Sequence, residues 1–185
     1  MQHPNILELS QSALLIIDVQ EAFRASMPNF EQLAKRIAIA AKGAQLLGVP
    51  IVVTEQYPKG LGQTAAEILE ALPRDINIID KTSFSSCGAQ KFQDELSRRG
   101  TRQVFVSGIE AHICVNQTVH DLLHAGLQVH LLTDCVTSRN ENDRAVAIQK
   151  MQSSGVIMSS LEMALFELMR DARHENFKAI QGLIK

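Results

Sequence analysis

The chain lacks any long apolar segment. No run of about 18 apolar residues occurs among its 185 residues, so no membrane-spanning helix is expected. Residues 1–10 contain no basic segment followed by an apolar stretch, and therefore do not predict a secretory signal. The formal net charge is only −2, which disfavours a nucleic-acid-binding surface. Together these absences predict a cytoplasmic protein that acts on neither membranes nor nucleic acids.

Cysteine is also scarce, and its spacing excludes common structural uses. The three cysteines are Cys87, Cys114 and Cys135, and an odd number without a signal peptide predicts reduced thiols. There is no C-x-x-C pair, no zinc-type spacing and no G-x-G-x-x-G motif leading from a strand into a helix. His120 and His124 are four residues apart, but their helical stripe is more typical of a solvated or subunit-contact face. We therefore expect neither a metal nor a cofactor.

The chain does contain six short apolar runs that alternate with segments of helical periodicity. The run at 13–17 is continuously apolar, which is typical of a parallel strand buried on both faces. A length of 185 residues fits one domain spanning residues 1–185. The expected strands are 13–17, 50–54, 76–79, 104–106, 129–132 and 156–158, and the expected helices are 30–47, 64–72, 89–99, 114–125, 140–154, 160–169 and 175–183. This alternation predicts an α/β fold, a three-layer α/β/α sandwich with a six-stranded parallel Rossmann-like sheet.

Charged and reactive side chains follow the ends of several predicted strands. In an open α/β sheet, ligands bind outside the carboxyl ends of the strands. Asp18 ends the first predicted strand, Lys81 follows the third and Cys114 follows the fourth. Asp134 and Arg139 follow the fifth. We therefore expect all five residues on one rim of the sheet.

Three of these residues suggest nucleophilic chemistry. Cys114 is predicted at a helix start, where the helix dipole and a nearby Lys81 would lower the pKa of its thiol. Asp18 could take the thiol proton, with Lys81 holding it ionised, and helix N–H groups could bind an oxyanion. Each residue alone also has a structural interpretation. Cys114 could be a small buried apolar residue, Asp18 could cap a loop, and Lys81 could be a solvated side chain. Their convergence on one rim favours catalysis.

Four sequence segments resemble the isochorismatase-like cysteine hydrolase superfamily, and specifically its isochorismatase domain-containing branch. These segments are 15–20 with Phe23, 81–85, 108–115 with Thr118, and 133–139. The resemblance runs from about Ala13 to Leu165. It implies a catalytic triad of Asp18, Lys81 and Cys114, a thioester intermediate and hydrolysis of an amide or related C–N bond. It also implies a cis peptide between Glu110 and Ala111, and a homo-oligomer.

Two departures narrow what the resemblance implies. Nicotinamidases of this superfamily carry a metal-binding Asp/His cluster after the second strand, whereas residues 54–60 contain no histidine. A metal-dependent nicotinamidase is therefore disfavoured. True isochorismatases lack the nucleophilic cysteine, so Cys114 speaks against vinyl ether cleavage. Ala111 stands where many amidases of the superfamily have threonine, and the substrate class is left open.

Further residues near these motifs are candidates for binding the substrate or an oxyanion. Aromatic side chains could form apolar walls, and residues on either side of the expected cis peptide could contact the substrate or another subunit. The candidates are Gln20, Phe23, Tyr57, Phe84, Glu110, Ala111, His112 and Ile113.

The sequence thus predicts a metal-independent cysteine hydrolase that acts on a small amide, imide or ureido-type metabolite. Three alternatives remain. Asp18 could act as the general acid of a vinyl ether hydrolase, with Cys114 a bystander. The chain could be a non-catalytic binding or scaffold protein that has kept the fold, although the intact Asp18, Lys81 and Cys114 weigh against this. Cys114 could also serve as a redox sensor.

Overall fold

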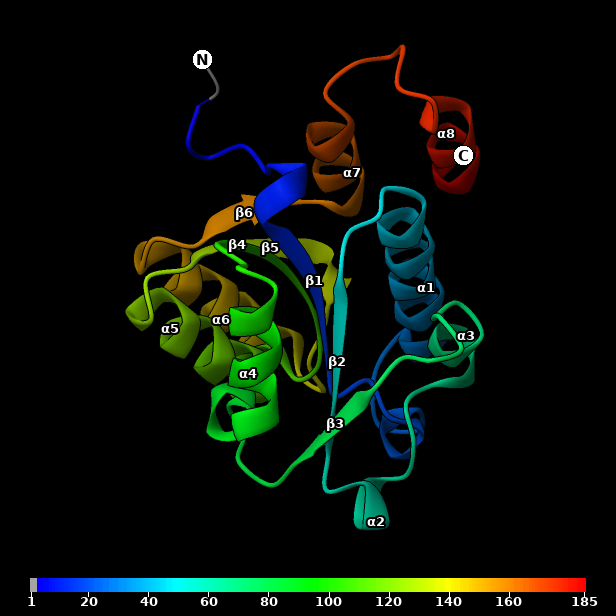
Figure 1. Ribbon diagram of the computed structural model, residues 1–185. Coiled ribbons are helices and arrows are strands. Elements are labelled where there is room, and N and C mark those ends of the chain that lie inside the picture. Colours follow the sequence, from blue (N-terminus) through cyan, green and yellow to red (C-terminus); the bar gives the residue numbers. More distant parts are fainter. Residues whose placement is uncertain (1–2) are drawn as a thin grey trace.

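The computed structural model describes residues 3–185 and contains a six-stranded parallel sheet between two layers of helices (Figure 1). The strand order is β3-β2-β1-β4-β5-β6, so the chain winds first to one side of β1 and then to the other. The strands are β1 (Ser12–Ile17), β2 (Ile51–Gln56), β3 (Ile78–Lys81), β4 (Gln103–Gly108), β5 (Gln128–Val136) and β6 (Ile157–Ser159). The predicted fold class is confirmed.

Seven of the helices cover the two faces of the sheet, and α2 (Pro58–Leu61) is a short turn after β2. One face carries α1 (Phe30–Leu46), α3 (Ala66–Leu69), α7 (Leu161–Met169) and α8 (Phe177–Ile184) (Figure 1). The other carries α4 (Gln90–Arg98), α5 (Asn116–His124) and α6 (Glu141–Ser153). Short helical turns are η1 (Leu9–Gln11), η2 (Glu21–Phe23), η3 (Ser86–Gly88) and the π-helical turn η4 (Ala111–Val115).

The apolar run of β1 divides its side chains between two cores. Leu14 and Ile16 pack into the core beneath α1, whereas Leu15 and Ile17 pack into the core beneath α4, α5 and α6. All six residues of β1 are buried. Successive side chains of a strand point to opposite faces, so only a continuous apolar run can serve two cores at once. This confirms the expectation for residues 13–17.

Some predicted boundaries were wrong for identifiable reasons. The expected helix at 64–72 is only the single turn α3, and Thr64 and Glu67 do not form a capping box. Thr64 donates from its backbone N–H and its hydroxyl to the Glu55 carboxylate instead, at 2.6 and 2.7 Å. Glu67 pairs with Arg24 at 2.8 Å. Contacts distant in sequence therefore replace the local cap.

The termini bear on two further expectations. The expectation that residues 1–10 form no secretory signal includes Met1 and Gln2, which lie outside the described residues. Within residues 3–185, no helix combines the length and apolar character needed to cross a bilayer.

Gly108 allows β4 to end directly against β1. Its φ is +132°, and a Cβ there would lie 2.2 Å from the carbonyl oxygen of Ile17 and 2.7 Å from its nitrogen. The next residue, Ile109, donates its N–H to that same carbonyl at 2.9 Å. Only glycine fits this close approach of two backbones. The loop that follows is thereby held beside the end of β1.

Replacing Gly108 with alanine should therefore destabilise the protein by about 4 kcal/mol or more, because backbone atoms cannot move aside as a flexible side chain can. Urea unfolding measures the difference. Gly126→Ala is the matched control: its φ is +84°, but no atom lies within 4 Å of its Cβ position. The control should lose only about 1 to 2 kcal/mol. Equal losses in the two variants would contradict the close-approach argument.

Candidate active site

Asp18 follows β1 directly and is turned inward by an unusual backbone conformation. Its φ is +55°, in the left-handed region that aspartate tolerates better than most residues. Its side chain is 2 % exposed. One carboxylate oxygen, Oδ1, accepts a hydrogen bond from the Thr54 hydroxyl at 2.7 Å, and the other, Oδ2, accepts one from the Lys81 ammonium at 2.6 Å. Both oxygens are thus fixed by residues at the ends of β2 and β3.

Lys81 is the last residue of β3, and its side chain is completely buried. Its ammonium is surrounded by four oxygen acceptors. Besides Asp18 Oδ2, these are Gln56 Oε1 at 2.8 Å, Phe84 O at 3.0 Å and Ser83 O at 3.1 Å. An ammonium has only three N–H groups, so the four oxygens share them. This number of oxygens compensates for the removal of the cation from water.

Cys114 lies within η4, two residues before α5 begins, and is 7 % exposed. The pKa of its thiol is raised to about 12. Burial is the largest cause, the negative charge of Asp18 is the second, and the positive charge of Lys81 opposes them. A hydrogen bond with Asp18 also contributes to this rise. The thiol is therefore protonated at neutral pH and lies beside a carboxylate that can accept its proton.

The expectation of a lowered thiol pKa was therefore wrong. Two N–H groups near Cys114, those of Ile113 and Val115, already donate to the carbonyl of Glu110, at 3.0 and 3.2 Å. Cys114 thus sits inside a closed turn, and burial together with the charge of Asp18 outweighs the attraction of Lys81.

The loop after β4 also departs from the expected oxyanion site. The N–H of Ala111 donates to the carbonyl of Thr137 at 2.8 Å, and the N–H of Ile113 is engaged as described above. Neither group is therefore available to a substrate in this structure. The cis peptide joins Ile109 and Glu110, one residue earlier than the expected bond between Glu110 and Ala111.

Glu110 and His112 bring the loop after β5 towards Cys114. Glu110 is buried and accepts hydrogen bonds from the backbone N–H and the Nε of Arg139, at 3.0 and 3.1 Å. Its charge contributes to the raised pKa of Cys114, so the two side chains lie close enough to interact. The Nδ1 of His112 lies 2.9 Å from the hydroxyl of Ser138. Charged residues at the ends of β1, β3 and β4 thus lie near the thiol, namely Asp18, Lys81 and Glu110.

The other predicted binding residues divide between surface and interior. Tyr57 and Phe84 are each 54 % exposed, and Tyr57 lines a cavity of about 490 Å³ together with Lys81 and Ser83. Phe23 packs against the core beneath α1. Gln20 is completely buried, and its side-chain amide bonds to backbone groups only. Gln20 therefore has a structural role in place of the expected contact with substrate.

Asp134 likewise serves the fold. Its Oδ2 accepts from the Arg36 guanidinium at 2.6 and 3.0 Å, and its Oδ1 accepts from the N–H of Leu161 at 2.9 Å. Asp134 thereby joins α1 to the start of α7.

Thr54 and Gln56 were not selected from the sequence, although both contact the Asp18–Lys81 pair. Both lie at the carboxyl end of the second strand, so the rule that selected Asp18 applied to them as well.

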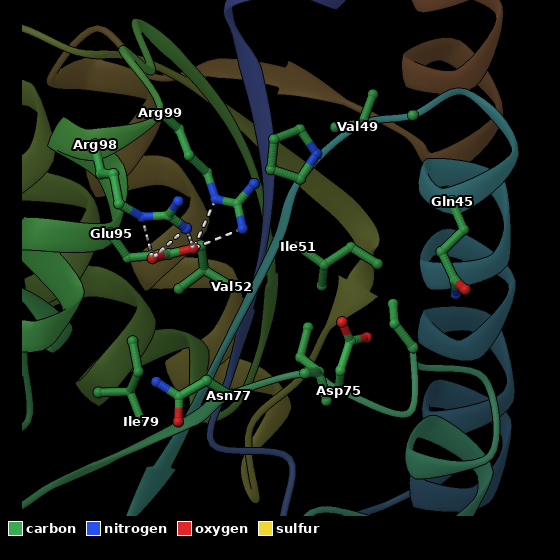
Figure 2. Close-up of a pocket in the computed structure, with 14 residues that line it drawn as sticks. Gln45, Val49, Ile51, Val52, Asp75, Asn77, Ile79, Glu95, Arg98 and Arg99 are labelled. Atoms are coloured by element: carbon green, nitrogen blue, oxygen red, sulfur yellow. Dashed lines mark hydrogen bonds and ion pairs between the residues drawn. The ribbon is translucent and has the colours of Figure 1, made fainter.

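A larger hollow than the one beside Tyr57 lies elsewhere. It has a volume of about 640 Å³ and opens at the amino-terminal ends of β2 and β3, among Val49, Ile51 and Asn77 (Figure 2). Glu95 at its wall is paired with Arg98 and Arg99, at 2.9 and 2.6 Å. No predicted site residue lines it, and ligands of open α/β sheets bind at the opposite ends of the strands.

Within residues 3–185, no group of three or more His, Cys, Asp or Glu side chains is arranged to hold a metal ion.

Comparison with known proteins identifies the family. The isochorismatase domain matches residues 12–163. The chain belongs to the isochorismatase family. Isochorismatase domain-containing protein 2A of Mus musculus is 43% identical over 175 residues, which cover 94% of this chain and 82% of the mouse protein. Membership makes the chain a hydrolase of the isochorismatase-like type.

Solved structures agree with the fold. The structure of MAR1 ribonuclease from Caenorhabditis elegans is 38% identical, with a TM-score of 0.92, and the match covers 97% of this chain and 92% of the other. The YcaC protein of Escherichia coli, described as an octameric hydrolase of unknown specificity, has a TM-score of 0.91 at 19% identity and covers 100% and 91% of the two chains. At that identity YcaC supports the fold alone.

The charge of Asp18 gives a direct test of the site's electrostatics. Asp18→Asn removes the negative charge that raises the pKa of Cys114 and leaves Lys81, which lowers it. Below its pKa, the thiolate fraction rises tenfold for each unit that the pKa falls. We therefore expect iodoacetamide to alkylate Cys114 about tenfold faster in this variant at pH 8.5. Peptide mass spectrometry follows the modification.

Two comparisons control this measurement. Asp80→Asn removes an exposed carboxylate next to Lys81 in sequence and should leave the rate within twofold. Cys87, whose pKa is raised to about 11 mainly by burial, serves as the internal reference thiol. An unchanged or slower rate at Cys114 in Asp18→Asn would show that the carboxylate does not control the thiol.

Proposed function

We propose that the chain is a metal-independent cysteine hydrolase that cleaves a C–N bond in a small amide, imide or ureido-type substrate. One observation carries this proposal: Asp18 is shared between the buried ammonium of Lys81 and the buried thiol of Cys114. The base thus lies beside both the nucleophile and the group that orients it, which is the arrangement that covalent catalysis uses. We assign these three roles to Cys114, Asp18 and Lys81.

The reaction follows from the protonation states. Asp18 accepts the thiol proton as Sγ of Cys114 attacks the substrate carbonyl carbon. The C–N bond then breaks, the nitrogen takes the proton from Asp18, and ammonia or an amine leaves a thioester on Cys114. Water attacks the thioester, giving one proton to Asp18, and the acid product departs as that proton returns to the sulfur. Asp18 is base and acid in turn.

The raised pKa of Cys114 is compatible with this cycle. A thiolate at rest would add a second negative charge beside Asp18, and burial disfavours it further. Proton transfer accompanying attack avoids that state, since Asp18 loses its negative charge as the sulfur loses its proton. Lys81 keeps the carboxylate aimed at the thiol while this occurs.

The surroundings support a small substrate. Tyr57 and Phe84 supply exposed aromatic surface at the ends of β2 and β3, and Glu110 and His112 supply polar groups from the turn after β4. We propose that these four residues line the entrance to Cys114. We also propose that the protein is a cytoplasmic homo-oligomer; the octameric YcaC protein shows that this fold can assemble in that way.

A substrate panel with matched variants tests the proposal. The panel contains small amides, imides and ureides together with isochorismate and an RNA oligonucleotide. We expect turnover of a member of the C–N class, and a loss of about 10⁴-fold in kcat in Cys114→Ala. Cys87→Ala is the matched control and should keep its activity, because Cys87 lies outside the proposed triad.

Other outcomes would redirect the assignment. Full activity of Cys114→Ala on isochorismate would favour vinyl ether hydrolysis with Asp18 as the acid. Cleavage of RNA alone would favour the activity named for the Caenorhabditis elegans relative. Reversible peroxide oxidation of Cys114 without any hydrolysis would favour a redox sensor. Each of these results would contradict the proposed cysteine hydrolase.

A further inference from the structure

We propose that Gln56 is a positioning residue that holds the Asp18–Lys81 pair in register with Cys114, and that Gln20 fixes Gln56 in turn. The inference rests on the proposed function, because it assigns Gln56 a purpose in presenting that pair to the thiol. The main support is the contact between Gln56 and the buried Lys81 ammonium. Among the described residues, the side-chain oxygen of Gln56 is the one neutral side-chain acceptor of that ammonium, at 2.8 Å.

The orientation of the Gln56 amide is determined by its two ends. Its Nε2 donates to the carbonyl of Thr82 at 2.7 Å, in the loop directly after β3. The amide has donors at one end and an acceptor at the other, so this contact directs Oε1 towards Lys81. The reverse orientation would place N–H groups against an ammonium. Gln56 therefore links the end of β2 to both Lys81 and the loop that surrounds it.

Gln20 explains why the backbone of Gln56 is fixed. The Oε1 of Gln20 accepts from the N–H of Gln56 at 2.8 Å, and its Nε2 donates to the carbonyls of Gln56 and Gly62, at 3.1 and 2.7 Å. The Gln20 side chain is completely buried, so no water competes for these bonds. The neighbouring N–H of Tyr57 donates to the carbonyl of Lys81 at 2.8 Å, which joins the ends of β2 and β3.

The neutrality of Gln56 matters as much as its position. Lys81 has Asp18 as its one carboxylate partner among its four contacts. A second carboxylate at position 56 would compete with Asp18 for Lys81 and add negative charge near Cys114. Both changes disfavour the thiolate, as the charges of Asp18 and Glu110 already do. A glutamine supplies the acceptor without that charge.

Alkylation of Cys114 by iodoacetamide tests the inference without any substrate. In Gln56→Glu we expect the rate at pH 8.5 to fall about tenfold, equivalent to a rise of about one unit in the thiol pKa. In Gln56→Leu the ammonium loses one fixed contact and stabilises the thiolate less, so we expect a fall of about threefold. Three acceptors remain for the three N–H groups of Lys81, which preserves the fold in this second variant.

Gln63→Glu is the matched control, because it adds the same charge to the exposed loop after α2 and should keep the alkylation rate within twofold. Thermal unfolding verifies that each variant is folded. Once a substrate is known, both variants at position 56 should lower kcat with little change in KM, since Gln56 is not assigned a substrate contact. A purely structural role would not alter the thiol rate in a folded protein.

A folded Gln56→Glu or Gln56→Leu variant that alkylates at the wild-type rate would overturn the inference. If Gln56→Glu does not fold, Gln56→Leu alone decides. The proposed function fails by a different result, namely full hydrolytic activity in Cys114→Ala. A loss of activity in that variant with unchanged alkylation at position 56 would remove the positioning role alone.

Discussion

The ion pair between Asp18 and Lys81 is the contact on which the geometry of the site depends. Both side chains are removed from water, and a buried charge left without its partner costs about 3 to 5 kcal/mol. The pair therefore requires further polar contacts, and the fold supplies them from the ends of adjacent strands. Thr54 bonds to the carboxylate, Gln56 bonds to the ammonium, and the loop after β3 curls its carbonyls around the same cation.

The same ion pair influences the protonation of the Cys114 thiol. Since Asp18 faces a cation on one side and the thiol on the other, it can accept a proton without leaving an unbalanced charge nearby. Together with burial, the larger cause, the charge of Asp18 contributes to raising the pKa of the thiol to about 12, so the sulfur is protonated at neutral pH. In the proposed mechanism, proton transfer to Asp18 accompanies the attack of the sulfur on the substrate carbonyl. Such an arrangement would also protect the cysteine from indiscriminate alkylation and oxidation.

Much of this arrangement was predictable because parallel sheets gather their strand ends. The continuous apolar run before Asp18 indicated a central strand, and the rule for strand ends placed Lys81 and Cys114 beside it without any contact being known. The sign of the Cys114 pKa shift was not predictable, because it depends on burial and on the distance to Asp18. The role of Gln20 was missed for a similar reason: hydrogen bonds to the backbone of Gln56 leave no spacing pattern in the sequence. Cap and turn details failed wherever distant side chains replaced local partners.

Trapping an acyl-enzyme on Cys114 distinguishes covalent catalysis from direct attack of water on the substrate. A hydrolysed amide substrate is mixed with the protein, quenched in acid within the first turnovers and analysed by intact-protein and peptide mass spectrometry. Covalent catalysis predicts an added acyl mass on Cys114 that hydroxylamine removes as the corresponding hydroxamate, as expected for a thioester. The Asp18→Asn variant should accumulate less of the adduct, because it lacks the proposed base and acid of the cycle. Turnover that proceeds with no adduct on Cys114 and no hydroxamate would contradict covalent catalysis by Cys114, since water would then attack the substrate directly.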